Sequence, residues 1–347
     1  MTDPSSTWTT NTNTTDLAQW LSEGASIAVL THARPDGDAI GSTTAITRAL
    51  NKAAGTKRAR IYYTGGMPRW SEDILGDTPH THIDKASDLS EFNPDRILVV
   101  DTGSWSQLDA LGEAIKSKAD ITAIVDHHLS GNPEIAERRI LATTAAAACE
   151  PIAELCQHIL KLDKPSDLPE SIARPLYLGL ATDTGWFKYS NVKPSTLRLA
   201  ACLLEAGIDH AALHVLIELN EAPARLRIVA KALSSLELLD RDRVAIMTLT
   251  TEDIHAAHAG PSDTGGLSNY ALSIGTVRVA ATITQVETTD PEPAAKISMR
   301  SKPGLHMVDV HEVAKKLGGG GHANAAGARL ACSVEEAKAK LIKALTQ

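Results

Sequence analysis

The feature that most constrains this chain is a short apolar run, residues 26–30, that leads directly into a turn containing His32, Asp36 and Asp38. The run is continuously apolar, as expected of a strand buried on both faces of a parallel sheet. Gly37 stands between the two aspartates, where it would let the backbone bend so that both carboxylates face one place. Imidazole and carboxylate groups are ligands for divalent cations, so the stretch looks like half of a metal site. Taken alone, it fits equally well an Asp/Gly turn that caps a helix.

The same arrangement recurs along the first part of the chain. Three further apolar runs end at turn-forming or acidic residues: residues 58–64, 95–100 and 121–125. Helix-like stretches separate the runs, and this alternation predicts an α/β fold whose first domain is a parallel sheet with helices on both faces. Ligands of such sheets bind at the carboxyl ends of the strands. His32, Asp101 and His127 are expected at those ends.

Length predicts two domains, because 347 residues exceed the ~100–200 typical of one. The second is expected to be a smaller mixed α/β domain, with a hairpin-like loop at residues 288–293. A Thr-, Ser- and Asn-rich start suggests a disordered tail. The predicted boundaries are a tail at residues 1–15, a catalytic domain at 16–220, a helical linker at 221–240 and a substrate-binding domain at 241–347.

Composition argues against several classes of protein. The chain has no run of about 18 apolar residues, so no membrane span is expected. A formal net charge of −8 at pH 7 does not suit a protein that coats long nucleic acid. The four cysteines form no CxxC pair, which favours free thiols and a cytoplasmic location.

Eight side chains with metal-binding or acid–base chemistry are expected where strands and helices end. They are His32, Asp36, Asp38, Asp101, Asp126, His127, His128 and Asp183. Carboxylates gathered in one crevice would repel one another unless cations neutralised them. Two divalent metals sharing Asp101 would do so, and a metal pair roughly 3.5–4 Å apart can hold a phosphoryl group for in-line attack. The set therefore predicts hydrolysis of a phosphoester or phosphoanhydride, although each Asp by itself also fits a helix cap.

Several motifs together resemble the DHH phosphoesterase family. In the first domain they are residues 32–42, 101–103, 126–128 and 182–185. In the second domain, Arg300 and residues 318–327 resemble the DHH-associated domain of the nano-RNase branch of that family. The resemblance covers about residues 16–345. It implies an enzyme that degrades short oligoribonucleotides and removes the 3′-phosphate of 3′-phosphoadenosine 5′-phosphate, with cyclic dinucleotides or their linear products as possible further substrates.

The resemblance also implies a role for each motif residue. Ligands of the first metal would be His32, Asp36 and Asp101. Those around the second would be Asp38, Asp101, His127 and Asp183. The catalytic set would be Asp101 together with His128, which donates to the scissile phosphate, and Asp126, which orients its neighbours. Mn²⁺ is the implied metal, with Mg²⁺ or Co²⁺ also compatible, and a homodimer is implied as well.

Four consecutive glycines, residues 318–321, precede His322 in the second domain. Glycine loses the most backbone entropy on ordering, yet it lets backbone N–H groups approach a phosphate closely. We therefore expect Gly319, Gly320 and Gly321 to contact a phosphate. His322 and Arg300 would add charge-assisted contacts to a phosphate or base, and Tyr270 could stack on a base. The alternatives are a helix C-cap with a surface loop for the glycines, and a core position for Tyr270.

Three other functions share part of this pattern. A manganese pyrophosphatase or polyphosphatase would have the first-domain motifs, but the glycine run and Arg300 match the branch that handles nucleotides. A RecJ-type exonuclease for long DNA fits a short acidic chain less well. A catalytically inactive nucleotide-binding sensor is disfavoured because every metal position holds a suitable ligand.

Overall fold

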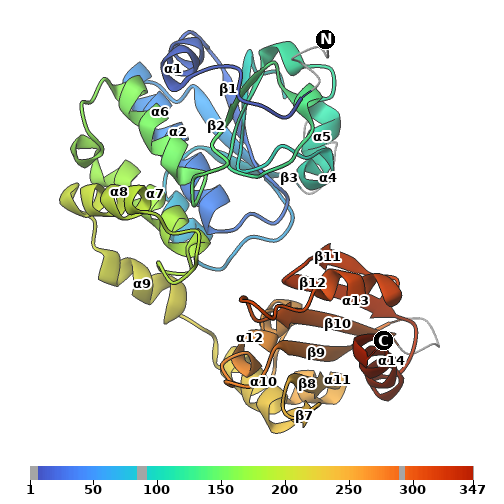
Figure 1. The fold of residues 1–347 in the computed structure, drawn as a ribbon. Coiled ribbons are helices and arrows are strands. Elements are labelled where there is room, and N and C mark those ends of the chain that lie inside the picture. Colours follow the sequence, from blue (N-terminus) through green and yellow to red (C-terminus); the bar gives the residue numbers. More distant parts are fainter. Residues whose placement is uncertain (1–6, 84–91, 289–293, 347) are drawn as a thin grey trace. The chain divides into compact units, whose positions relative to one another are not determined.

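The computed structural model describes residues 7–83, 92–288 and 294–346, and the chain divides into two compact units, Met1–Leu219 and Asn220–Gln347 (Figure 1). Each unit contains a six-stranded sheet of its own. Short 3₁₀ helices connect several elements: η3 (Ala119–Ile121), η4 (Pro133–Ile135), η5 (Pro165–Asp167) and η6 (Pro261–Thr264). Of the predicted loop at residues 288–293, residues 289–293 lie outside the described part of the chain.

The first sheet is entirely parallel, with the strand order β3-β2-β1-β4-β5-β6. Its strands are β1 (Ile27–Leu30), β2 (Ala59–Thr64), β3 (His80–Ile83), β4 (Arg96–Val100), β5 (Thr122–Asp126) and β6 (Arg138–Leu141). The parallel sheet predicted from the sequence is confirmed. The edge strands β3 and β6 were not predicted, because neither is a continuous apolar run.

Helices cover both faces of this sheet (Figure 1). Alternate strand residues enter two cores: Val29 and Leu98 pack on one face, and Leu30 and Val99 on the other. The first face carries α1 (Thr14–Ser22), α2 (Gly37–Ala54), α3 (Ser71–Leu75), α6 (Cys149–Leu160), α7 (Glu170–Asp183), α8 (Pro194–Glu205) and α9 (His210–Glu218). The second carries α4 (Trp105–Leu108) and α5 (Ala110–Ile115).

Residues 7–15 differ from the predicted disordered tail. The Asn11 side chain donates to the Glu137 carbonyl oxygen at 2.8 Å and accepts from the Arg139 backbone N–H at 2.7 Å. Helix α1 then begins at Thr14, capped by Asn13. Polar side chains thus tie this segment to the edge strand β6 through hydrogen bonds, which a composition argument does not detect. Residues 1–6 of the predicted tail lie outside the described residues.

The second sheet is mixed, with the order β11-β12-β10-β9-β8-β7. Its strands are β7 (Glu237–Leu239), β8 (Val244–Leu249), β9 (Val279–Val286), β10 (Ala294–Ser301), β11 (Gly320–His322) and β12 (Ala325–Leu330). Only β8 and β9 pair in parallel among the described strand pairs of this sheet. One face packs on α10 (Pro223–Ser234), α11 (Thr251–Ala256) and α12 (Ser268–Ala271), and the other on α13 (Val310–Lys316) and α14 (Val334–Thr346).

The predicted helical linker at residues 221–240 is different in the structure. Helix α10 ends at Ser234, and the chain continues into β7 at the edge of the second sheet. Ile228, Val229 and Ala232 of α10 are buried in the core of the second unit. Because their apolar stripe packs on that sheet, the segment belongs to the second unit.

No single helix among the described residues is long and apolar enough to cross a membrane. Helices α8 and α9 are long and apolar enough only when they are taken together as a pair, and the two helices meet at a bend of 109°.

Candidate metal centre

Asp36 and Asp38 lie at the start of α2, directly after strand β1. Asp36 is the N-cap, and its Oδ1 accepts hydrogen bonds from the backbone N–H groups of Asp38 at 3.0 Å and Ala39 at 3.1 Å. The same oxygen lies 3.8 Å from His32 Nε2. The helix cap and the metal site, the two interpretations of this turn from the sequence, are therefore compatible, because the capping carboxylate also faces the histidine.

Gly37 has a different role from the one predicted. It is the first residue of α2 and does not have a positive φ angle. A Cβ atom there would lie 2.2 Å from Thr182 Oγ1 on α7. Gly41 has a similar constraint, since its Cβ would lie 2.3 Å from the Pro175 carbonyl oxygen. These glycines let α2 approach α7 closely, and that approach brings the start of α2 near Asp183 at the end of α7.

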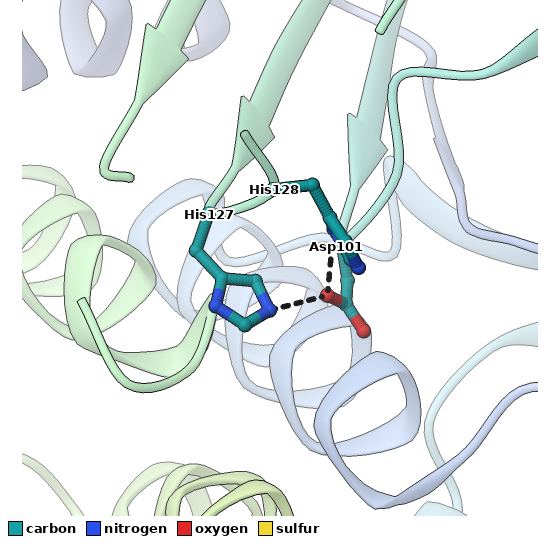
Figure 2. A group of neighbouring side chains, drawn as sticks. All are labelled: Asp101, His127 and His128. Atoms are coloured by element: carbon teal, nitrogen blue, oxygen red, sulfur yellow. Dashed lines mark ion pairs between the residues drawn. The ribbon is translucent and has the colours of Figure 1, made fainter. Parts of the chain in front are cut away.

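Asp101 occupies the centre of the cluster. It follows β4 with a φ of 60°, a left-handed conformation in which non-glycine residues are uncommon, and it is only 3% exposed. Its Oδ2 lies 3.5 Å from His32 Nε2, and its Oδ1 lies 3.4 Å from His127 Nε2. Figure 2 shows this carboxylate between His127 and His128, with His128 Nδ1 at 4.0 Å. Oδ1 has no hydrogen-bond partner among the described residues.

Asp38 and Asp183 also face Nε2 of His127. His127 Nε2 is 3.9 Å from Asp38 Oδ2 and 3.4 Å from Asp183 Oδ2. The Asp38 carboxylate is buried and accepts hydrogen bonds from the backbone N–H groups of Ala148 at 2.5 Å and Cys149 at 3.0 Å. These two donors at the start of α6 fix its orientation, and sequence reasoning did not identify them.

Asp126 holds the pair of histidines that follows it. Its Oδ1 accepts from the backbone N–H groups of His127 at 2.7 Å and His128 at 3.2 Å, and lies 2.7 Å from His128 Nδ1. The Asp126 side chain is buried, whereas that of His128 is about half exposed. This contact directs Nδ1 of His128 toward Asp126 and leaves Nε2 available to another molecule.

The carboxylates of the cluster are crowded. Burial, followed by the negative charges of Asp101 and Asp183, raises the pKa of Asp38 well above its ordinary value. Burial and Asp101 raise the pKa of Asp183 to about 7. Burial disfavours protonation of the histidines, but nearby carboxylates outweigh it and raise the pKa of both His32 and His127 to about 10. The site therefore favours added positive charge.

The cluster offers ligand atoms to more than one divalent cation. Three groups have ligand atoms within 4.8 Å of one another: His32, Asp36 and Asp101; Asp38, His127 and Asp183; and Asp101, His127 and His128. Mixed imidazole and carboxylate donors suit borderline and hard divalent ions. The unpartnered Oδ1 of Asp101 lies where a bound ion would satisfy it. The residues present therefore fit two ions that share Asp101.

The second unit contains a groove of about 700 Å³ on the β10–β12 side of its sheet. Arg300 and residues 319–321 line it. Gly320 and Gly321 belong to β11, and a Cβ at Gly321 would lie 2.5 Å from the Ala325 carbonyl oxygen, so close strand pairing also requires glycine there. His322 shares a cross-strand row with Arg300 through Ala325. Tyr270, on α12, is 45% exposed, so the alternative of a core position is wrong.

Trp8 is a neighbour of the cluster that sequence reasoning missed. Its indole Nε1 donates to the His128 carbonyl oxygen at 3.2 Å. Its ring lies against Gly103 and Gly131, where an added Cβ would come within 1.8 Å and 2.5 Å of it. Trp8 therefore contacts the loops that follow Asp101 and His128. The residues around Trp8 in the sequence are polar, and nothing in their pattern indicates that Trp8 contacts these loops.

Comparison with protein families identifies both units. A family model described as the DHH family, N-terminal domain, matches residues 26–180, and one described as the DHHA1 domain matches residues 244–347. The two matches follow in the order of the two sheets. The chain therefore contains a DHH domain followed by a DHHA1 domain.

Relatives of this DHH protein span most of its length. It is 28% identical over 323 residues to the bifunctional oligoribonuclease and PAP phosphatase NrnA of Thermus thermophilus, covering 92% of this chain and 89% of that one. It is 26% identical to the cyclic-di-AMP phosphodiesterase GdpP of Geobacillus thermodenitrificans, across 95% of this chain and 48% of that one. An exopolyphosphatase-related protein from Bacteroides fragilis, 24% identical, has the same fold, with a TM-score of 0.85 over 96% of this chain and 95% of that one.

Proposed function

We propose that this DHH protein hydrolyses short oligoribonucleotides to mononucleotides and removes the 3′-phosphate of 3′-phosphoadenosine 5′-phosphate. The observation that carries the proposal is the buried Asp101 carboxylate shared between two sets of metal-binding side chains. The named activities of the NrnA relatives support this choice of substrates. Similarity to GdpP supports cyclic dinucleotides or their linear products as a further substrate class.

Two divalent ions would complete the site, and Mn²⁺ is the ion that we favour. His32, Asp36 and Asp101 would hold one, and the other would be held by Asp38, Asp101, His127 and Asp183. The chemistry that such ions supply is polarisation of a phosphoryl group and activation of water at neutral pH. The protein contributes a rigid ligand set, because Asp36 is fixed by the α2 N-terminus and Asp38 by the α6 N-terminus.

His128 is suited to contact the substrate phosphate. Its hydrogen bond to Asp126 raises its pKa, which favours the protonated ring. With Nδ1 directed at Asp126, Nε2–H remains as a donor for a phosphoryl oxygen that gains charge during hydrolysis. Asp126 acts through His128 and through the hydrogen bonds that it accepts from two backbone N–H groups.

In the second unit, we assign nucleotide binding to the groove. The Arg300 guanidinium can pair with a phosphate or base, and backbone N–H groups of Gly319, Gly320 and Gly321 can approach a phosphate closely. His322 and the exposed Tyr270 are proposed contacts of the same substrate. The relatives named for nucleotide substrates make a pyrophosphatase, a long-DNA exonuclease or an inactive sensor less favoured.

The test is incubation of purified protein with Mn²⁺ and either a two- to five-nucleotide RNA or 3′-phosphoadenosine 5′-phosphate. Mononucleotides should accumulate from the RNA, and inorganic phosphate should be released from the bisphosphate. Asp101→Ala should abolish both while leaving the circular dichroism spectrum unchanged. Wild-type protein that releases neither product with Mn²⁺, Mg²⁺ or Co²⁺ would contradict the proposal.

We also infer a cytoplasmic homodimer. All four cysteines are free, and three of them are buried, which is consistent with a reducing compartment.

Family resemblance suggests the dimer. Light scattering after size-exclusion chromatography should give twice the chain mass of 36.8 kDa.

A further inference from the structure

Part of the second sheet carries a polar face that its helices leave open. On the α10–α12 side, these helices contact mainly β8 and β9, and the groove lies over β10 and β12. Residues 296–300 all line the groove, but their side chains alternate: those of Ile297 and Met299 are buried in the core with α13 and α14, whereas Lys296, Ser298 and Arg300 lie on the opposite face of β10. The side chains of the open face therefore come from every second residue of β10.

Lys296 and Arg329 form a row across this face. They are direct cross-strand partners on β10 and β12, and Thr284 of β9 stands on the other side of Lys296. Both cationic side chains are exposed, and neither forms an ion pair or side-chain hydrogen bond within the described residues. Like charges directly opposite each other destabilise a sheet, and an anion between them would relieve the repulsion.

The same pair also borders a second hollow. This hollow, of about 320 Å³, adjoins the groove through Lys296 and Arg329, which line both. Its other walls combine apolar and polar side chains: Thr251, Ile254, His255, Ala259, Thr264, Thr284, Gln285, Val286 and Glu287. Its size lies within the range of small-molecule sites. The acidic group in it, Glu287, is already paired with His255 at 2.5 Å.

Arg300 does not border this second hollow. It lies four residues from Lys296 on the same strand, a separation of about 13 Å between their Cα atoms by ordinary strand geometry. The chain thus presents one cation at the glycine-lined part of the groove, and two more where the groove meets the hollow.

We propose that Lys296 and Arg329 bind an internal phosphodiester of an oligonucleotide, and that the adjoining hollow receives the next nucleoside. The assignment rests on the proposed function of the enzyme. A substrate with one nucleoside, such as 3′-phosphoadenosine 5′-phosphate, would occupy the glycine-lined part of the groove near Arg300 without reaching this pair. An oligonucleotide has both a further phosphate and a further nucleoside to place there. The pair therefore favours oligonucleotides over the nucleoside bisphosphate.

The decisive variant is the full-length double substitution Lys296→Ala and Arg329→Ala. Both positions are exposed, so the fold should remain, and Lys296→Gln serves as a milder second variant. Steady-state kinetics at fixed Mn²⁺ should show KM for a tri- to pentanucleotide RNA raised about tenfold or more, with KM and kcat for the bisphosphate unchanged. Lys315→Ala is the matched control, because Lys315 is an exposed lysine of the same unit that pairs with Glu312.

A direct binding measurement tests this inference independently of the proposed catalytic function. Fluorescence anisotropy of a labelled trinucleotide with the Asp101→Ala protein should show weaker binding in the double variant. The slope of log Kd against log salt should also fall by about 0.7, as for one lost phosphate contact to a single strand. Unchanged RNA binding, or equal losses for RNA and bisphosphate, would overturn the inference. If wild-type protein has no phosphoesterase activity, the proposed function fails and the anisotropy result alone decides the subsite.

Discussion

At the level of single residues, Asp126 offers a clear test of how the histidine pair is positioned. Asp126→Asn keeps the shape of the side chain but removes the charge that faces His128 Nδ1 at 2.7 Å. We expect kcat for 3′-phosphoadenosine 5′-phosphate to fall by about 10–100-fold, as for other groups that orient metal-site residues. The pKa of His128 should fall toward its ordinary value, which NMR titration would detect. An exposed control is Asp120→Asn, and equal kinetics for the two variants would contradict this role.

The protonation of the metal-free cluster predicts pH-dependent metal binding. His32 and His127 have pKa values of about 10 and are protonated at neutral pH, and Asp183, at about 7, is partly so. An ion must displace these protons, so the affinity for Mn²⁺ should rise as the pH increases from 6 to 9. Calorimetry in buffers of different ionisation enthalpy should detect proton release at pH 7. Affinity that does not change with pH would contradict the predicted ligands.

At the level of elements, the close packing of α2 on α7 determines where the ligands stand. Gly41→Ala would place a Cβ 2.3 Å from the Pro175 carbonyl oxygen, a backbone atom that cannot rotate away. We expect a loss of about 1–3 kcal/mol in the free energy of unfolding, measured by urea denaturation. Gly66→Ala in the same unit is the control, because nothing lies within 4 Å of its added Cβ and its φ is not positive. Equal stability of both variants would show that α2 can shift at no cost.

The segment that precedes α1 should stabilise the loops after β4 and β5. Trp8→Ala removes both the ring that lies against Gly103 and Gly131 and the hydrogen bond to the His128 carbonyl oxygen. Trp8→Phe removes the hydrogen bond and the distal six-membered ring of the indole, which lies against the two glycines, but it keeps an aromatic ring at this position. We expect the alanine variant to lose about 1–3 kcal/mol of stability and to bind Mn²⁺ more weakly, with the phenylalanine variant between it and wild type. Unchanged Mn²⁺ affinity in Trp8→Ala would restrict this segment to a purely structural role.

At the level of the whole molecule, the two units have separate cores, and within the described part of the chain only the first contains the metal-binding cluster. Mn²⁺ at about 100 times its Kd should stabilise that unit by about 2.7 kcal/mol. Calorimetry should therefore show one unfolding transition that moves to lower temperature on chelation and another that stays in place. In Asp101→Ala, neither transition should respond to Mn²⁺. Equal shifts of both transitions would mean that the units unfold together.

The sequence by itself determined the α/β class, the strands β1, β2, β4 and β5, and the residues that meet at their carboxyl ends. Those strands are short and apolar because parallel sheets are covered on both faces, so their pattern depends little on distant parts of the chain. Asp101 and Asp126 could be placed for the same reason, since each lies at the end of such a strand. The edge strands and the ordered segment at residues 7–15 left no comparable pattern.

Only the tertiary structure decided which oxygen of each carboxylate faces which neighbour. Asp38 is oriented by N–H donors 110 residues away in the chain, and Gly37 is required by Thr182 rather than by its own turn. Trp8 reaches His128 across 120 positions. The Lys296 and Arg329 row likewise exists only because β12 pairs with β10 in this register. Such contacts depend on how elements pack, and a linear pattern of residue types contains local periodicity but not that packing.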